Sequence, residues 1–311
     1  MNPIICIAGP TASGKTALAV ELALALNGEV VSCDSMQVYK RMDIGTAKPT
    51  LEERRGIPHH MIDVAEPWED YSVSRYCAQA APIVEDIVAR GKTAIIAGGT
   101  GLYLDSLIRG NDFAPFPSTG VREQLEAQAD REGIEVLFAR LQQIDPAAAA
   151  RLPLSDRKRI IRALEVYLET GETITAHNLR TQQQPPRFAP AWLGLDFESR
   201  AALYSRIDAR VGQMLEAGLL EEIRSLLADG IPEKCTAMQA IGYKEFTAAL
   251  EGHCTIDQAA DLVRQSSRRY AKRQLTWFRR NRELHWLVRR PGQTDAEILS
   301  QARQLLQEND R

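Results

Sequence analysis

The chain has 311 residues, of which 44% are hydrophobic and 25% are charged. This composition is that of a folded globular protein and excludes a disordered or collagen-like chain, and the length predicts about two domains. Lysine and arginine number 38 against 41 aspartates and glutamates, a formal net charge of −3. The protein is therefore no overall polycation, and any surface for nucleic acid must be local.

The five cysteines are scattered and form no C-x-x-C pair, which favours reduced thiols. The first residues lack the positive charges of a signal sequence. No stretch reaches the roughly eighteen apolar residues of a membrane span. We therefore expect a cytoplasmic protein with no membrane partner.

Short apolar runs alternate with helical patterns in the first third of the chain, which predicts a parallel sheet flanked by helices. After Gly110 the sequence becomes helix-rich up to the linker-like segment TQQQPPR, and a strand then returns the chain to the sheet. Strands are predicted over 4–8, 29–32, 93–97 and 192–197, and helices over 16–26, 71–90, 203–228 and 256–282. We assign 1–111 and 191–290 to a core with a basic C-terminal helical segment, 112–190 to an inserted helical domain with its linker, and 291–311 to a C-terminal tail.

The segment GPTASGKT, residues 9–16, matches the P-loop pattern G-x-x-x-x-G-K-[ST] between a predicted strand and a predicted helix. Its backbone N–H groups converge on a phosphate, its lysine adds charge, and its last hydroxyl holds Mg²⁺. The expected fold class is therefore α/β, a P-loop parallel sheet flanked by helices with an inserted all-helical domain. The candidate phosphate-binding residues are Gly9, Pro10, Thr11, Ala12, Ser13, Gly14, Lys15 and Thr16, with Thr16 as the Mg²⁺ ligand.

A P-loop kinase normally offers a second strand that ends in aspartate, but the strand over 93–97 ends in Gly98-Gly99-Thr100. The nearest carboxylate is Asp34, directly after the strand over 29–32. Ligands of open α/β sheets bind at the carboxyl ends of the strands, so Asp34 should face the P-loop ligand. From the residues alone, the interpretations of Asp34 are a Mg²⁺ ligand, as in a kinase, or a helix N-cap.

Six motifs follow one another in order: GPTASGKT, DSMQVYK from Asp34, DIGTAKP from Asp43, GGTGLY from Gly98, QAIGYKE from Gln239 and KRQLTWFR from Lys272. Together they resemble the bacterial tRNA dimethylallyltransferases, or tRNA isopentenyltransferases. The resemblance implies transfer of a dimethylallyl group from dimethylallyl diphosphate to N6 of the adenosine 3′ of the anticodon, with release of diphosphate. It also implies Mg²⁺, the anticodon stem-loop of tRNA as partner, and a monomer.

The resemblance assigns roles to single residues. Asp34 is expected to be the general base, while Lys15 and Thr11 stabilise the charge that develops on the leaving diphosphate. Arg206 and Arg210 lie four residues apart on one predicted helix face and match the family's R-x-x-x-R pattern, so we expect them to clamp the diphosphate, unless they are solvated surface charges. Thr100 is expected to contact the substrate, with a simple turn residue as the alternative.

The stretch 262–290 holds ten basic residues against Glu283 alone, with aromatic residues between them. Such a concentration is typical of a polyanion-binding surface, although a solvated helix face is the alternative. We expect the target base to be flipped out of its loop into a tunnel that the isoprenoid diphosphate enters from the other side. The expected tRNA-binding residues are Asp34, Ser35, Met36, Gln37, Thr100, Arg122, Lys158, Arg159, Ile160, Ile161, Arg162, Gln239, Ala240, Ile241, Gly242, Tyr243, Lys244, Lys272, Arg273, Gln274, Leu275, Thr276, Trp277, Phe278 and Arg279.

Two other classes of function remain open at this point. A P-loop kinase of a small metabolite would explain the loop, the sheet and a helical lid, but leaves the basic and aromatic stretch unexplained. A noncatalytic RNA-binding P-loop protein leaves Asp34 and the ordered motifs unexplained. Within the family, QAIGYKE and KRQLTWFR favour action on tRNA over action on free adenine nucleotides.

Overall fold

The computed structural model describes residues 3–111 and 119–308. The chain forms two compact units, one made of Met1–Ile108 with Arg187–Arg311 and the other of Arg109–Pro186. The first unit contains the sheet, and among the described residues of the second unit the regular elements are all helices. Among the described residues, no helix is both long enough and apolar enough to cross a membrane.

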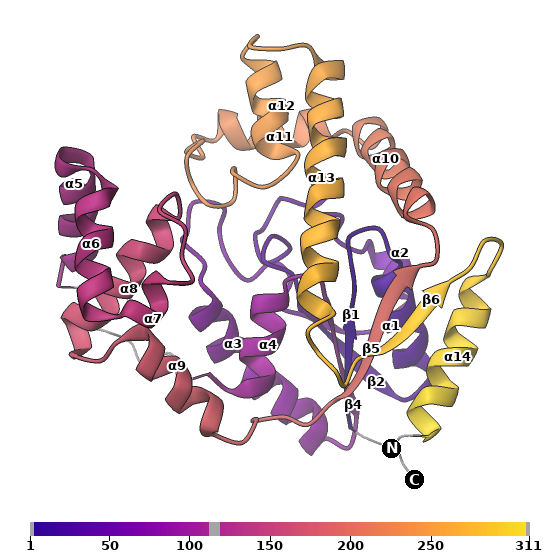
Figure 1. Ribbon diagram of the computed structural model, residues 1–311. Coiled ribbons are helices and arrows are strands. Elements are labelled where there is room, and N and C mark those ends of the chain that lie inside the picture. The colour runs from indigo at the N-terminus through magenta and orange to yellow at the C-terminus, as the bar shows by residue number, and fades with distance from the viewer. Residues whose placement is uncertain (1–2, 112–118, 309–311) are drawn as a thin grey trace. The chain divides into compact units, whose positions relative to one another are not determined.

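A six-stranded parallel sheet organises the first unit, in the order β3-β2-β4-β1-β5-β6 (Figure 1). The central strand β1 pairs on one side with β4, where Ile5 lies beside Ile95, and on the other with β5. The α/β fold class expected from the sequence is thereby confirmed. The strands are β1 (Ile4–Ala8), β2 (Gly28–Cys33), β3 (His59–His60), β4 (Thr93–Gly98), β5 (Ala191–Phe197) and β6 (His285–Arg289).

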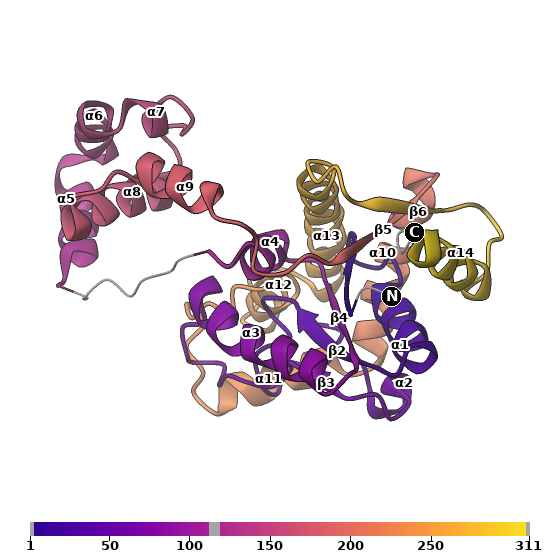
Figure 2. The same cartoon turned by 90° about the horizontal axis from the view of Figure 1, so that it is seen from below.

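Helices cover both faces of this sheet (Figure 2). Because successive side chains of a strand point to opposite faces, Ile5 and Ile7 of β1 belong to one core cluster, and Cys6 and Ala8 to another. The helices of this unit are α1 (Lys15–Ala25), α2 (Leu51–Arg54), α3 (Val73–Ala89), α4 (Gly101–Arg109), α10 (Arg200–Glu216), α11 (Leu219–Ala228), α12 (Tyr243–Leu250), α13 (Ile256–Phe278) and α14 (Asp295–Glu308).

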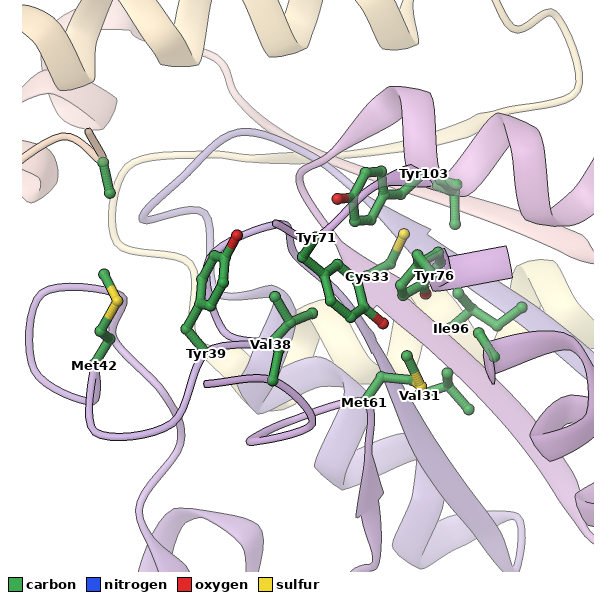
Figure 3. Close-up of a cluster of buried hydrophobic side chains, with 14 of the residues drawn as sticks. Val31, Cys33, Val38, Tyr39, Met42, Met61, Tyr71, Tyr76, Ile96 and Tyr103 are labelled. Carbon is green, nitrogen blue, oxygen red and sulfur yellow. The ribbon is translucent and has the colours of Figure 1, made fainter. Parts of the chain in front are cut away.

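The larger core cluster joins the sheet to the loops that carry two of the sequence motifs. Figure 3 shows Cys33 and Ile96 of the sheet beside Tyr76 and Tyr103, whose rings stack with centroids 4.7 Å apart. Tyr39, from the DSMQVYK motif, is fully buried in the same cluster. Burial of these large side chains therefore anchors the loop that follows β2 and places Asp34 at the end of the strand.

Three expectations about this unit are wrong. The single helix predicted over 203–228 is two helices, because Gly218 adopts a left-handed conformation with φ of 99° between them. The segment 283–290, predicted as part of a helical region, contains β6 instead. Within the segment predicted as a tail, Asp295–Glu308 form α14, which buries Ile298, Ala302 and Leu306 in the core cluster that also contains residues of α1. Their spacing of four residues is that of an amphipathic helix.

The second unit has a core of its own. Leu137, Leu141 and Leu164 are fully buried in it, and Asp145 joins two of its helices by accepting hydrogen bonds from the N–H groups of Ala148 and Thr175 at 2.9 and 3.0 Å. Its helices are α5 (Val121–Glu132), α6 (Ile134–Ile144), α7 (Pro146–Ala149), α8 (Arg157–Thr170) and α9 (Ile174–Gln183).

The basic segment of α8 is divided between this core and the solvent. Ile160 and Ile161 are buried, so their side chains cannot contact tRNA as expected. Lys158 and Arg159 are exposed. Arg122 and Arg162 both form ion pairs with Glu165, at 2.8 Å each. The positive charge of this face is therefore partly neutralised within the unit.

Candidate active site

The P-loop connects β1 to α1 and shapes an anion site at the carboxyl end of the central strand. Gly14 takes a left-handed φ of 93° and precedes the first residue of α1, Lys15. The Lys15 Nζ atom donates to the carbonyl oxygen of Pro10 at 2.6 Å, which folds the side chain back across the loop. The buried Ser13 Oγ has no hydrogen-bond partner among the described residues. An unused buried hydroxyl in such a loop is consistent with a ligand that supplies its partner.

Two arginines of α10 reach this loop from the side. Arg206 Nε donates to the carbonyl oxygen of Ala12 at 3.0 Å, and Arg210 Nη1 donates to Thr11 Oγ1 at 3.4 Å. The predicted spacing of four residues thus brings both guanidinium groups to the P-loop. Arg206 is exposed and supports the loop backbone, whereas the less exposed Arg210 also faces a cavity described below.

The positive charges at this site are poorly compensated. The pKa of Lys15 is lowered to about 7, chiefly by burial and also by the nearby Arg210 charge, while Asp34 acts in the opposite direction. Burial also lowers the pKa of Arg210. Burial makes the charged forms of these two side chains unfavourable. A bound anion stabilises those charged forms, because its negative charge compensates for the lost hydration. The geometry and the charge therefore both indicate an anion-binding site.

Asp34 lies in a turn directly after β2. Its Oδ1 atom accepts hydrogen bonds from the N–H groups of Met36 and Gln37, at 2.9 and 3.4 Å. The residues that follow form a turn and not a helix, so the helix N-cap interpretation of Asp34 is wrong. Thr100 holds this turn in place, since its Oγ1 atom accepts from the Ser35 N–H at 3.0 Å.

Gln37 connects the same turn to the DIGTAKP loop. Its Nε2 atom donates to the carbonyl oxygens of Thr46 and Ala47, at 3.2 and 3.1 Å, and its Oε1 atom accepts from Ser32 Oγ at 2.9 Å. Within this structure the polar atoms of Gln37 are therefore used to join two loops. We expect Gln37 to affect a bound substrate mainly by holding these two loops in position.

Gln274 braces the P-loop against the GGTGLY turn. Its Oε1 atom accepts from the Thr11 N–H and its Nε2 atom donates to the Gly99 carbonyl oxygen, both at 2.9 Å. A Cβ atom on Gly99 would lie 2.2 Å from that Nε2 atom, which explains glycine at this position. Gln274 is largely buried and lines the smaller cavity described below, and both ends of its amide are occupied inside the protein.

Two cavities meet above the P-loop. The smaller has a volume of about 90 Å³ and is lined by Lys15 and Thr16, and the larger, of about 390 Å³, extends between α10, α13 and the segment before α12. Asp34 is the only acidic side chain among the described residues that line either one. The residues common to both cavities are Thr11, Asp34, Thr46, Arg210 and Tyr270.

Many predicted site residues line the larger cavity, and the structure adds others. Tyr270, whose pKa burial raises to about 12, is a neutral phenol at the junction of the two cavities. Neither Tyr270 nor Thr46 is among the site residues expected from the sequence. Tyr270 lies in the aromatic and basic stretch and Thr46 in the DIGTAKP motif, so each motif pointed to the right segment without singling out the residue. The predicted tRNA-binding residues that line the larger cavity are Asp34, Ser35, Met36, Gln239, Ala240, Ile241, Gly242, Lys244 and Arg273.

The predicted KRQLTWFR surface has one face in the protein core. Leu275 and Phe278 are buried, so their side chains cannot contact tRNA as expected. Trp277 packs against Gly101, where a Cβ atom would lie 2.3 Å from its ring, and donates to Asp105 Oδ2 at 2.9 Å. The exposed residues of the motif are Lys272, Arg273, Thr276 and Arg279.

Part of the positive charge in 262–290 is neutralised by acidic residues. Arg268 pairs with Asp208 at 2.5 Å, and Arg279 pairs with Asp196 at 3.2 Å. Arg264 and Arg289 also form ion pairs, with Asp261 and Asp295 respectively. Arg269, Lys272 and Arg273 form no ion pair with any described residue. The positive charge of 262–290 that is left unpaired is therefore smaller than the number of basic residues in this stretch suggests.

Tyr243 is the first residue of α12 and was expected to contact tRNA. It is fully buried, and its hydroxyl donates to Glu222 Oε1 at 2.6 Å. Its side chain is therefore unavailable to a partner, and the expectation is wrong for that side chain. Neighbouring Gln239 and Lys244 are exposed.

A P-loop beside two cavities that share lining residues, at the carboxyl end of a parallel sheet, is the architecture of a P-loop enzyme. The chain belongs to the IPP transferase family: the family model described as IPP transferase matches residues 37–281, and one described as isopentenyl transferase matches residues 2–69.

Similar proteins include the tRNA dimethylallyltransferases of Thermomicrobium roseum and Carboxydothermus hydrogenoformans. The first is 46% identical over 94% of this chain and 88% of its own length, and the second is 49% identical over 91% of each. The solved tRNA isopentenylpyrophosphate transferase of Bacillus halodurans is 40% identical with a TM-score of 0.73, over 99% of this chain and 97% of that one. A eukaryotic dimethylallyltransferase acting on tRNA is 30% identical with a TM-score of 0.82, over 99% of this chain and 78% of that one.

The lowered pKa of Lys15 leads to a testable pH dependence. Above pH 7 the free site holds a neutral amine, and a bound diphosphate raises the pKa and recharges it, so binding takes up a proton between about pH 7 and the ordinary lysine range. Calorimetry with inorganic diphosphate at pH 8.5, in buffers of different ionisation enthalpy, measures this uptake. The Lys15→Ala variant corrects for the proton equilibria of diphosphate itself. Equal uptake by both proteins would contradict the prediction.

Proposed function

We propose that this chain transfers a dimethylallyl group from dimethylallyl diphosphate to N6 of the adenosine 3′ of the anticodon in tRNA, with release of diphosphate. The observation that carries the proposal is the junction of the two cavities at Asp34, in a member of the IPP transferase family. The small cavity beside Lys15 suits a diphosphate, and the larger cavity leaves room for a flipped base.

The reaction needs a carbon–nitrogen bond to form while a carbon–oxygen bond breaks. The amine nitrogen attacks the allylic carbon, the diphosphate leaves with the bonding electron pair, and the nitrogen loses a proton. Asp34 accepts that proton as general base. Lys15, Arg210 and Thr11 stabilise the charge that develops on the leaving group, because they already converge on the P-loop before the reaction begins.

Thr16 is the proposed protein ligand of Mg²⁺. Its side chain lies on the first turn of α1 and lines the same small cavity as Lys15 and Asp34. No group of three or more histidine, cysteine or acidic residues suitable for a metal occurs among the described residues. Mg²⁺ often takes one or two protein ligands and completes its shell with phosphate oxygens and water, so this arrangement fits it. When bound, the ion would add positive charge to the leaving diphosphate.

The tRNA is held by surface charge and positioned by the larger cavity. The exposed Lys272 and Arg273 of α13 contribute to the first task, as do the exposed Lys158 and Arg159 of the helical unit. A base inside a folded anticodon loop is reached by flipping it out. Action on tRNA is consistent with a cytoplasmic location. The alternative of a small-metabolite kinase leaves the family membership unexplained.

The decisive experiment incubates the protein with Mg²⁺, bulk tRNA and dimethylallyl diphosphate labelled in the dimethylallyl group. We expect label to enter the RNA, and digestion to nucleosides to recover it on N6 of adenosine. ATP should not be consumed. Absence of label in RNA, together with ATP hydrolysis in the presence of a small metabolite, would favour the kinase alternative.

The role of Asp34 is tested by Asp34→Asn, which keeps the shape of the side chain and removes its basicity. Loss of a positioned general base costs on the order of 10²- to 10⁴-fold in rate. Single-turnover transfer should therefore fall by that order, while the affinities for tRNA and dimethylallyl diphosphate change only a few-fold. If high Mg²⁺ restores both diphosphate affinity and rate, Asp34 is a metal ligand and the proposed role is wrong.

The role of α13 is tested by Lys272→Ala, because Lys272 is exposed and forms no ion pair with a described residue. Removing one phosphate contact should weaken tRNA binding and reduce the slope of log affinity against log salt by about one. Affinity for dimethylallyl diphosphate should be nearly unchanged. Arg303→Ala, which removes an exposed charge from α14, is the matched control and should leave the slope as it is. Equal slopes for the wild type and Lys272→Ala would contradict the prediction.

A further inference from the structure

A carboxylate of α11 binds the backbone of the DIGTAKP loop. Glu222 Oε2 accepts hydrogen bonds from the N–H groups of Asp43 and Ile44, both at 2.8 Å, and Glu222 Oε1 accepts from the Gly45 N–H at 3.2 Å. Three successive N–H groups that converge on one anion form a backbone nest. Hydrogen bonds to an ionised acceptor are stronger than those between neutral groups. The loop is therefore held by a side chain from a distant helix.

The same carboxylate binds a buried residue of the QAIGYKE motif. The Tyr243 hydroxyl donates to Glu222 Oε1 at 2.6 Å, and burial together with the Glu222 charge raises the pKa of Tyr243, so it remains a neutral donor. The Tyr243 ring lies against Gly45, where a Cβ atom would be 2.5 Å from Cε2. Glu222 thus joins two motifs that are far apart in the sequence.

Both motifs contribute to the wall of the larger cavity. Gly45 and Thr46 line the larger cavity from the DIGTAKP loop, and Gln239 and Lys244 line it from the QAIGYKE motif. Neither Glu222 nor Tyr243 is among the lining residues. Any effect of this pair on a substrate must therefore pass through the loops that it holds.

A continuous set of hydrogen bonds leads from Glu222 to Asp34. Thr46 follows the nest directly, and its carbonyl oxygen accepts from Gln37 Nε2 at 3.2 Å. The Gln37 N–H in turn donates to Asp34 Oδ1 at 3.4 Å. Movement of the DIGTAKP loop would therefore shift Gln37 and change the position of Asp34 relative to the larger cavity.

We infer that Glu222 and Tyr243 are positioning residues for the transfer reaction, which hold these two motifs of the larger cavity's wall in the arrangement that aligns Asp34 with the reacting amine. The inference rests on the proposed function. Alignment matters most in the transition state, where a misplacement of about 1 Å costs on the order of 100-fold. The pair should therefore affect the rate of transfer more than the binding of either substrate.

The test compares Glu222→Gln with Glu221→Gln, measuring kcat and the KM for tRNA and for dimethylallyl diphosphate. Glutamine has nearly the same shape, but its amide nitrogen is a donor that faces donors of the loop and of Tyr243. We expect kcat to fall about 10- to 100-fold, with each KM within about threefold of its wild-type value. Glu221 is exposed and pairs with Arg224 of its own helix at 2.8 Å, so Glu221→Gln should match the wild type.

A second variant, Tyr243→Phe, tests the same contact from its other side and changes only one hydroxyl group. Its kcat should fall less than that of Glu222→Gln, and the double variant should be no slower than Glu222→Gln alone, because the two residues share one contact. Additive losses would overturn the shared role. If Glu222→Gln fails to fold, Tyr243→Phe alone tests the inference. Its kcat should fall while each KM stays close to the wild-type value.

Two further outcomes separate this inference from the proposed function. If the wild type transfers label to tRNA and folded Glu222→Gln has an unchanged kcat, with only a lower unfolding temperature, the pair is merely structural and the inference is wrong. If the wild type transfers no label, the proposed function fails and this inference fails with it.

Discussion

The site depends on two positive charges that the fold holds close together with little compensation. Lys15 and Arg210 come from segments almost two hundred residues apart, and burial lowers the pKa of both. Asp34 is the only acidic side chain among the described residues that line either cavity. In the free protein this arrangement costs electrostatic energy, which a bound diphosphate would offset. The same arrangement would place Asp34, the proposed base, beside the leaving group.

Holding these charges in place requires braces from outside the P-loop. Gln274 of α13 binds the Thr11 N–H and the Gly99 carbonyl oxygen with the two ends of one amide. Glu222 of α11 binds three N–H groups of the DIGTAKP loop. Both braces fix loop backbone, which has many conformations when it is unsupported. The motifs are therefore parts of one hydrogen-bonded frame around the cavities.

The sequence was most informative where function requires particular residue types at a fixed spacing. The P-loop pattern predicted the strand, the turn and the start of α1, and the ordered motifs identified the family, which the comparisons confirm. It was least informative where packing decides. Gly218 ended a helix that amphipathic spacing alone would have continued, and β6 formed in a segment with only Leu287 buried. Ile298, Ala302 and Leu306 have the apolar spacing of a helix face, but that spacing does not say which core the helix packs against.

The sequence by itself determined that this chain has a P-loop, a parallel α/β sheet, a helical insertion and the motifs of its family, because those features depend on local backbone requirements and on short patterns of residue types. Only the tertiary structure decided which motif residues face a cavity. Leu275, Phe278 and Tyr243 stand within motifs, yet they are buried as supports, while Tyr270 and Thr46 line both cavities. The physical reason is that a helix or loop presents only one side to a ligand, and the side it presents is set by packing against segments that are distant in the chain.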